Sequence, residues 1–372
     1  MTETLRKEMA GDRREASRLV YSQKPFLIYW ELTRACDLAC RHCRAEAMAQ
    51  RDPGELSTPE AMGLLKSIGE FGGHAPHLVL TGGDPLKRPD FFDLLGYGAR
   101  LGLRMSVAPS GTSALTREVL RRFKAAGVES ISLSLDGSSA EGHDGFRGVP
   151  GCFARTIEAA RLARGARLAL QINTLVTAET RSDLADIYRL VRELSPMRWS
   201  LFSLIAVGRG STLREITPEQ CETLHHWLYE ISKEGPFAVA TTESPHFRRV
   251  AVARMRAEGI PLARIRETSV GRGFGIRDGN GIMFISHTGD VYPSGFLPLT
   301  TGNVRMADIV GIYRESEVFR VIRQTSRFRG RCGWCEFKEI CGGSRARAYA
   351  MTGDFLETDP LCAYDPGNHR EH

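Results

Sequence analysis

Six short apolar segments, each followed by a helical pattern, recur along the chain at intervals of roughly 25 to 40 residues. This alternation of strand and helix is typical of a parallel sheet, and the near-continuous apolar character of the strands indicates burial on both faces. Ligands of such sheets bind at the carboxyl ends of the strands. We therefore predict an α/β fold with its site along that edge. The predicted strands span 25–32, 77–85, 103–111, 130–137, 167–177 and 198–208.

The pattern changes after residue 230. An arginine-rich stretch over 235–275 is expected to be irregular. Residues 281–295 predict a β-hairpin that turns at 287–290, and a short helix is expected near 306–324. We therefore divide the chain into a polar leader (1–24), a barrel (25–235), a bridging segment (236–280) and a C-terminal domain (281–372).

Composition narrows the class of protein. The 372 residues are 42% hydrophobic and 25% charged, as in soluble globular proteins. With no run of about 18 apolar residues and no apolar signal-peptide core at the N-terminus, we expect a cytoplasmic protein without a membrane partner. The net charge of +6 is dispersed, which argues against nucleic-acid binding. The arginine-rich segment 248–267 fits either a solvated helix face or a surface that attracts an anionic substrate.

Seven of the nine cysteines form two groups near opposite ends of the chain. Their odd number and the expected reducing compartment argue against disulfides and favour metal or redox chemistry. The first group, C-x3-C-x2-C, can hold three irons of a [4Fe–4S] cluster and leave one iron open. A zinc site completed by His42 or a distant residue is the alternative. The second group fits a fully ligated cluster or a four-thiolate zinc. The groups are Cys36, Cys40 and Cys43, and Cys332, Cys335, Cys341 and Cys362, whereas Cys152 and Cys221 are expected to be small packing residues.

The first motif, CDLACRHC (36–43), follows an apolar strand and resembles the motif of the radical S-adenosylmethionine (SAM) superfamily. The strand–helix repeats resemble the TIM-like partial (β/α)6 barrel of that superfamily. The resemblance implies SAM and a [4Fe–4S] cluster as cofactors. GGDP (82–85) has Asp84 where the family usually has Glu, and His42 stands where it usually has an aromatic side chain. The implied cofactor-binding residues are Gly82, Gly83, Asp84, Ser110, Ser134, Asp136, Asn173 at the end of the fifth strand, Val207 and His42.

The C-terminal region resembles the SPASM extension of many radical SAM enzymes, a SPASM/twitch-like α+β domain. The full SPASM pattern has seven cysteines and usually two auxiliary clusters. Here Ser294 and Arg345 stand at two of the cysteine positions, and no cysteine lies between 222 and 331. The resemblance therefore implies one auxiliary [4Fe–4S] cluster on the four C-terminal cysteines, and two clusters in the whole chain.

The resemblance also implies a reaction. Reductive cleavage of SAM, with an electron from a flavodoxin- or ferredoxin-type reductant, yields a 5′-deoxyadenosyl radical that abstracts a hydrogen from the substrate. The auxiliary cluster would accept an electron from the product radical. Residues 29–47 and 286–304 resemble the heme d1 and alternative heme biosynthesis branch, whose members act on carboxylated tetrapyrroles. An anionic substrate of this kind suits the arginine-rich surface between 248 and 277, where Arg272 and Arg277 are candidate contacts; no general acid or base is predicted.

Three alternatives remain open. Related SPASM branches modify ribosomal peptides by thioether or carbon–carbon links, so a peptide substrate is one of them. Dehydrogenation or decarboxylation of a sugar or nucleoside is another. A protein without catalytic activity, in which zinc or clusters serve binding, is the third, although it leaves the barrel motifs unexplained.

Overall fold

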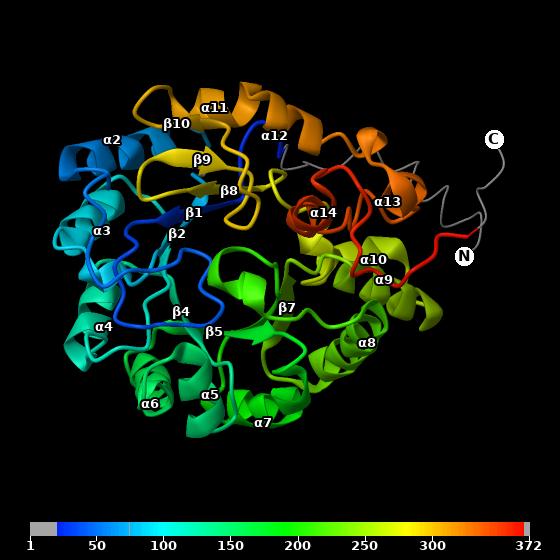
Figure 1. The fold of residues 1–372 in the computed structure, drawn as a ribbon, viewed down its shortest axis with the longest axis horizontal. Helices are drawn as coiled ribbons and strands as arrows, with labels where there is room; N and C mark the ends of the chain where they lie inside the picture. Colours follow the sequence, from blue (N-terminus) through cyan, green and yellow to red (C-terminus); the bar gives the residue numbers. More distant parts are fainter. Residues whose placement is uncertain (1–20, 74, 368–372) are drawn as a thin grey trace.

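The computed structural model describes residues 21–73 and 75–367, so most of the predicted leader (1–24) lies outside the described residues. The described strands form one ten-stranded sheet in the order β10-β9-β8-β1-β2-β3-β4-β5-β6-β7 (Figure 1). The strands are β1 (Leu27–Glu31), β2 (His77–Thr81), β3 (Met105–Val107), β4 (Ser130–Ser134), β5 (Ala169–Val176), β6 (Arg198–Ser203), β7 (Ala238–Thr242), β8 (Ile282–Ile285), β9 (Asp290–Tyr292) and β10 (Gly302–Asn303).

The six predicted strands correspond to β1–β6, and each neighbouring pair from β1 to β7 is parallel. The intervening helices form an outer arc around the curved sheet (Figure 1). This arrangement confirms the predicted α/β barrel. The helices are α2 (Thr58–Gly69), α3 (Phe91–Arg100), α4 (Arg117–Ala125), α5 (Ala140–Arg147), α6 (Cys152–Gly165), α7 (Leu184–Leu194), α8 (Pro218–Glu234), α9 (Phe247–Ala257), α10 (Leu262–Glu267), α11 (Ile309–Glu315), α12 (Glu317–Ile322), α13 (Gly330–Trp334) and α14 (Arg345–Thr352).

The two faces of the sheet differ in polarity. In β4, Ile131 and Leu133 are buried in the core, whereas the serines between them are only half-buried. Strand β5 alternates in the same way, with Gln171 and Asn173 on its half-buried face. Because side chains alternate across a strand, these polar residues line the inner surface of the barrel. The prediction of apolar burial on both faces is therefore wrong for β4 and β5.

The segment 235–275, expected to be irregular, contains regular structure. Strand β7 pairs in parallel with β6 and extends the sheet by one strand. Helices α9 and α10 follow, and α9 buries Phe247, Val250 and Met255 on its inner face. The many arginines of this stretch concealed the apolar periodicity from the sequence analysis. The predicted domain bounds remain a prediction, because no break in the sheet marks them.

The C-terminal region joins the barrel through its first strand. β8 and β9 form the predicted antiparallel hairpin, and β8 also pairs in parallel with β1, with Ile28 opposite Met283. The helix expected near 306–324 is present as α11 and α12. Because β8 lies beside β1, the residues that follow the two strands come together at one edge of the sheet.

Candidate active site and cluster sites

The cysteine loop, which we define as residues 32–49 after β1, contains neither helix nor extended strand. Its first half lies against the glycine pair at the end of β2. Gly83 donates its N–H to the carbonyl of Thr33 at 2.7 Å, and Asp84 donates to the carbonyl of Ala35 at 2.7 Å. A Cβ on Gly83 would lie 2.4 Å from the Ala35 oxygen, and a Cβ on Gly82 would lie 2.5 Å from the Thr33 oxygen. Only glycine permits this close approach of two backbones.

Two further glycines hold the second half of the loop. A Cβ on Gly148, after α5, would lie 2.6 Å from the Ala39 oxygen. A Cβ on Gly208, after β6, would lie 2.7 Å from the Cys43 oxygen. The neighbouring Arg209 donates from Nε to the Cys40 carbonyl at 2.9 Å and from its backbone N–H to the Cys43 carbonyl at 3.1 Å. The loop is therefore clamped from three elements of the barrel.

Each of the three loop sulfurs has a neighbouring hydrogen-bond donor. Leu38 N–H lies 3.3 Å from the Cys36 sulfur, which also contacts the Ser110 hydroxyl at 3.4 Å. Ala47 N–H lies 3.3 Å from the Cys43 sulfur. Cys40 receives a guanidinium N–H of Arg147 at 3.6 Å. Such donors stabilise thiolate ligands and tune iron–sulfur sites. The loop therefore fits a [4Fe–4S] cluster on Cys36, Cys40 and Cys43.

Asp84 is fully buried, and its carboxylate is hydrogen-bonded to neighbouring residues. Its carboxylate accepts from the Leu86 N–H at 3.1 Å and from the Thr112 hydroxyl at 3.1 Å. Burial raises the pKa of the Asp84 carboxyl. The Ser110 hydroxyl donates to the Gly83 carbonyl at 2.8 Å. Asp84 and Ser110 thus fix the position of the glycine pair against the cysteine loop.

Asp136 forms a buried ion pair with Arg147. Its second oxygen accepts from the Leu175 N–H at 2.7 Å. Burial would raise the pKa of Asp136, but the Arg147 guanidinium and neighbouring groups more than offset this and lower it. Arg147 therefore connects the end of β4 with the Cys40 sulfur. Sequence reasoning did not identify Arg147, and no motif or spacing around it could have done so.

The other predicted cofactor-binding residues lie on two surfaces. Ser134 and Asn173 are register partners on β4 and β5 and share the inner face of the barrel, where Asn173 accepts from the Gln171 amide at 2.8 Å. The sequence analysis expected Asn173 at the end of the fifth strand, but this residue lies within β5. The His42 ring is stacked on Phe146 with centroids 4.8 Å apart, and burial lowers its pKa to about 4.

A cleft of about 430 Å³ opens between the cysteine loop, the segment after β6 and the C-terminal hairpin. Its lining includes Val207, one of the predicted residues, and the cations of Arg34 and Arg44. Arg44 pairs with Glu31 and lies over the Phe284 ring at 4.4 Å. The complete lining is Glu31, Arg34, Arg44, Ala45, Glu46, Val207, Gly208, Phe284, Ser286, His287, Thr288, Tyr292, Ser294, Gly295, Phe296, Leu297 and Pro298.

His287 connects the hairpin with the cysteine loop across this cleft. Its Nδ1 lies 2.7 Å from Glu31 Oε1, and its Nε2 lies 3.4 Å from Asp52 Oδ2. Burial would lower the pKa of His287, but the hydrogen bonds and charges of Glu31 and Asp52 raise it above the usual 6.5. The charged form of this ring is therefore more favoured than in a free imidazole, and the protonated ring would add a third cation to the wall of the cleft.

The predicted substrate contacts Arg272 and Arg277 do not line this cleft. Arg277 is buried and donates to the carbonyls of Gly275 at 3.0 Å and Arg323 at 3.3 Å. Arg272 donates to the Glu267 carbonyl at 3.0 Å. The buried Arg277 supports local backbone, so the prediction is wrong for this residue, whereas for the exposed Arg272 it stays a prediction.

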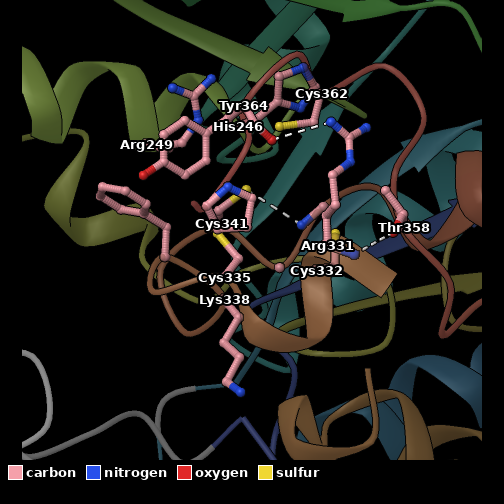
Figure 2. A pocket seen from close by; sticks show the side chains of 14 residues that line it. His246, Arg249, Arg331, Cys332, Cys335, Lys338, Cys341, Thr358, Cys362 and Tyr364 are labelled. Atoms are coloured by element: carbon pink, nitrogen blue, oxygen red, sulfur yellow. Dashed lines mark hydrogen bonds between the residues drawn. The ribbon is translucent and has the colours of Figure 1, made fainter. Parts of the chain in front are cut away.

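The four C-terminal cysteines surround one small cavity of about 30 Å³ (Figure 2). Burial raises the pKa of Cys335 to about 12 and also raises the pKa of Cys341 and Cys362. Gly343 N–H lies 3.4 Å from the Cys341 sulfur, and Asp359 N–H lies 3.5 Å from the Cys332 sulfur. A bound metal ion stabilises thiolates and so offsets the cost of burying them. The four sulfurs and their N–H donors therefore fit a four-cysteine metal or cluster site.

Arg345 occupies one of the positions where the full SPASM pattern has a cysteine. Its buried guanidinium donates to the carbonyls of Phe355 at 3.1 Å and Glu357 at 2.7 Å, and it contacts the Cys332 sulfur at 3.5 Å. All nine cysteines of the chain are free thiols. The described residues thus assemble one group of four thiols in this domain.

Comparisons with known proteins agree with this geometry. Residues 30–191 match the model of the radical SAM superfamily. The chain is 39% identical over 349 residues to the AdoMet-dependent heme synthase of Methanosarcina barkeri, covering 94% of this chain and 99% of that protein. It is 28% identical to the pre-heme d1 synthase of Dinoroseobacter shibae, covering 91% of this chain and 86% of that one. The crystal structure of Streptococcus suis SuiB bound to S-adenosylmethionine shares the fold, with a TM-score of 0.71, 16% identity and coverage of 92% and 78%.

The chain therefore is a radical SAM enzyme and belongs to the family of the AdoMet-dependent heme synthases. Membership implies a [4Fe–4S] cluster and SAM as cofactors. Among the described residues, no helix has the length and apolar character needed to cross a membrane.

The Gly83→Ala substitution tests the docking of the cysteine loop. A methyl group 2.4 Å from the Ala35 oxygen forces the two backbones apart. We expect a loss of about 1–3 kcal/mol in the free energy of unfolding, measured in urea, and a lower iron content after anaerobic reconstitution. The control is Gly63→Ala in α2, where a Cβ meets nothing within 4 Å and stability should stay equal or rise by up to about 1 kcal/mol. If Gly83→Ala kept the stability and the iron content of the wild type, the result would contradict the proposed fixing of the cysteine loop by Gly83.

The His287→Gln substitution tests the ion pair across the cleft. Because the folded-state pKa of His287 is raised above 6.5, its contribution to stability is fully present below that pH and is lost as pH rises through the folded-state value. We therefore expect the variant to lose more unfolding free energy at about pH 6 than at about pH 9. The control His226→Gln, at a half-exposed position, should stay within about 0.5 kcal/mol of wild type at both pH values. An equal loss at both pH values in His287→Gln would exclude a charged His287.

Proposed function

We propose that this enzyme oxidatively decarboxylates the propionate side chains of a carboxylated tetrapyrrole. The observation that carries the proposal is the cleft beside the cysteine loop, whose wall carries Arg34, Arg44 and His287, the last two sharing Glu31 as a partner. Cations of this kind pair with carboxylates, and guanidinium groups do so in bidentate geometry. The identity of 39% with a protein named AdoMet-dependent heme synthase supports the same substrate class.

Of the residues proposed to hold the cofactors, Val207 lines this cleft, and the three cysteines belong to the loop that forms one of its walls. Cys36, Cys40 and Cys43 would hold the first cluster. The backbone of Gly82 and Gly83 and the residues Ser110, Ser134, Asp136, Asn173, Val207 and His42 would bind SAM. When bound, these cofactors supply a 5′-deoxyadenosyl radical on reduction by a flavodoxin- or ferredoxin-type protein. The protein orients the substrate and excludes water. A propionate that loses a hydrogen atom, one electron and carbon dioxide becomes a vinyl group.

The C-terminal thiols are proposed to hold an auxiliary [4Fe–4S] cluster that receives this electron. Four protein ligands leave no position for substrate, so electron transfer suits this site better than substrate binding. Arg249, Arg331 and Lys338 line the same cavity and offset the negative charge of a thiolate-bound cluster (Figure 2).

The cysteine variants separate the two cluster sites. Cys36→Ala should abolish 5′-deoxyadenosine formation, because one ligand of the first cluster is lost. Cys335→Ala should retain SAM cleavage but lose substrate oxidation. We would measure iron, sulfide and 5′-deoxyadenosine after anaerobic purification, with about eight irons per chain expected in wild type. The control is Asp37→Asn, an exposed residue of the same loop.

Two results would contradict this assignment. Normal 5′-deoxyadenosine formation in Cys36→Ala would show that the first group does not hold the catalytic cluster. Equal loss of SAM cleavage and oxidation in Cys335→Ala would assign a structural role to the second group. Zinc in place of iron, without SAM cleavage, would favour a binding protein.

Arg44→Met tests the substrate. We expect about tenfold weaker binding of a propionate-bearing iron porphyrin, about 1.4 kcal/mol, with SAM cleavage unchanged. The matched control is Arg51→Met, shortly after the cysteine loop. The Arg51 guanidinium pairs with Glu55 and does not line the cleft. Titration of porphyrin absorbance measures both affinities. Turnover of a peptide or a nucleoside by the wild type, with no porphyrin binding, would establish one of the alternative substrates.

A further inference from the structure

Cys221 lies outside both cysteine groups and is fully buried in α8. His225 follows it by four residues, so the two side chains lie on the same face of the helix. His246 comes from the residue before α9, beyond β7, and is also buried. These three residues bring one sulfur and two ring nitrogens within 4.8 Å of one another.

Ser244 completes a four-atom arrangement around one point. The Cys221 sulfur lies 3.2 Å from His246 Nε2, 3.7 Å from His225 Nε2 and 3.7 Å from the Ser244 hydroxyl. The Ser244 hydroxyl lies 2.9 Å from His225 Nε2 and 3.4 Å from His246 Nε2. All four side chains therefore direct a ligand atom toward the same space.

Three of these five separations, at 3.4 to 3.7 Å, are close to the edges of a tetrahedral metal site, whereas the Cys221–His246 distance of 3.2 Å and the Ser244–His225 distance of 2.9 Å are shorter. Zinc–ligand bonds of about 2.0–2.3 Å at tetrahedral angles place neighbouring ligand atoms roughly 3.3–3.6 Å apart. Hydrogen bonds between oxygen and nitrogen are shorter, about 2.7–3.2 Å. The contact of Ser244 with His225 suits a hydrogen bond, whereas the contact of Ser244 with His246 has the length of a tetrahedral edge.

We infer that Cys221, His225 and His246, with the Ser244 hydroxyl in the fourth position, bind a divalent cation of the zinc type. One thiolate and two imidazoles are ligands that zinc prefers, and a closed tetrahedral set is typical of structural zinc. Binding releases the thiol proton to solvent and leaves a site with one net positive charge. This inference is independent of the substrate proposed above.

The surroundings supply counter-charges for such a site. His246 Nδ1, the ring nitrogen that would not bind the metal, lies 3.7 Å from Asp359 Oδ2, which is ion-pair range but longer than a hydrogen bond. The nearby cations have carboxylate partners: Arg249 pairs with Glu222, and Arg347 pairs with Glu215 at 2.7 Å. The positive charge of the metal therefore does not meet an unpaired guanidinium here.

The position of the site indicates its role. His246 also lines the cavity of the four C-terminal cysteines (Figure 2). A metal held by α8 and the segment after β7 would fix this ring, and with it one wall of the auxiliary site. The site is thus a structural connection between the seventh strand of the barrel and the C-terminal thiols.

Metal analysis of the anaerobically reconstituted full chain tests the inference. We expect roughly one zinc per chain beyond the cluster iron. Cys221→Ala and His225→Ala should lose this zinc and retain the iron. The control His226→Ala removes the neighbouring, half-exposed ring and should keep the zinc. Cys335→Ala should keep the zinc as well. Cobalt added to the wild type in place of zinc should show a thiolate-to-cobalt absorption band, which is absent from Cys221→Ser.

The metal content of these variants distinguishes the proposed zinc site from the cluster cysteines. Zinc that persists in Cys221→Ala but disappears in Cys335→Ala would place the metal on the cluster cysteines and overturn the inference. Absence of zinc from the wild type, together with no thiolate–cobalt band, would also overturn it and leave a hydrogen-bonded cluster. Cys221→Ser is close in size to the native residue, so retention of the cluster iron shows that it has folded, and loss of the cobalt band can then be assigned to the missing thiolate. Failure of SAM cleavage would contradict the proposed function without affecting the zinc stoichiometry.

Discussion

The close approach of glycine backbones to the cysteine loop is the constraint on which the remaining site depends. The loop has neither helix nor extended strand, so its conformation is imposed from outside by Gly83, Gly148 and Gly208, which follow β2, α5 and β6. A side chain at any of these positions would occupy the space of a loop carbonyl. The positions of the three thiols are therefore set by the spacing of barrel elements, and a change in the barrel is transmitted directly to the metal ligands.

Buried ion pairs form a second connection between the barrel and the two cysteine groups. The ion pair of Arg147 with Asp136 reaches the Cys40 sulfur, and Arg347 connects Glu215 on the barrel side with Asp359 beside the C-terminal thiols. Removing one partner of such a pair leaves an uncompensated charge, which costs about 3–5 kcal/mol. The first cysteine group therefore has a guanidinium on one of its sulfurs that is itself held by a carboxylate. Arg347 reaches the second group through Asp359, whose N–H lies 3.5 Å from the Cys332 sulfur.

Local sequence patterns predicted much of this structure, because periodicity and spacing are local properties. The six strands, the hairpin over 281–295 and the grouping of the four C-terminal thiols were all predicted from them. The predictions failed where contacts join distant residues. Arg147 meets Cys40 across 107 positions, and Arg209 meets the same residue across 169, with no motif to indicate either contact. The assignment of 235–275 as irregular failed for another reason, since a high density of arginines hid an apolar helix face.

The parallel pairing of β1 with β8 has a consequence for the order in which the molecule is made. Leu27–Glu31 leaves the ribosome early, but its partner Ile282–Ile285 is synthesised only after more than two thirds of the chain. Until then β1 remains an unpaired edge, and the cysteine loop that follows it lacks the hairpin wall that carries His287. Contacts of such long sequence separation form late and slowly during folding. Assembly of the first iron–sulfur site in its final surroundings is therefore a late event that requires most of the chain to be synthesised, and the nascent chain must keep three thiols reduced until the hairpin arrives.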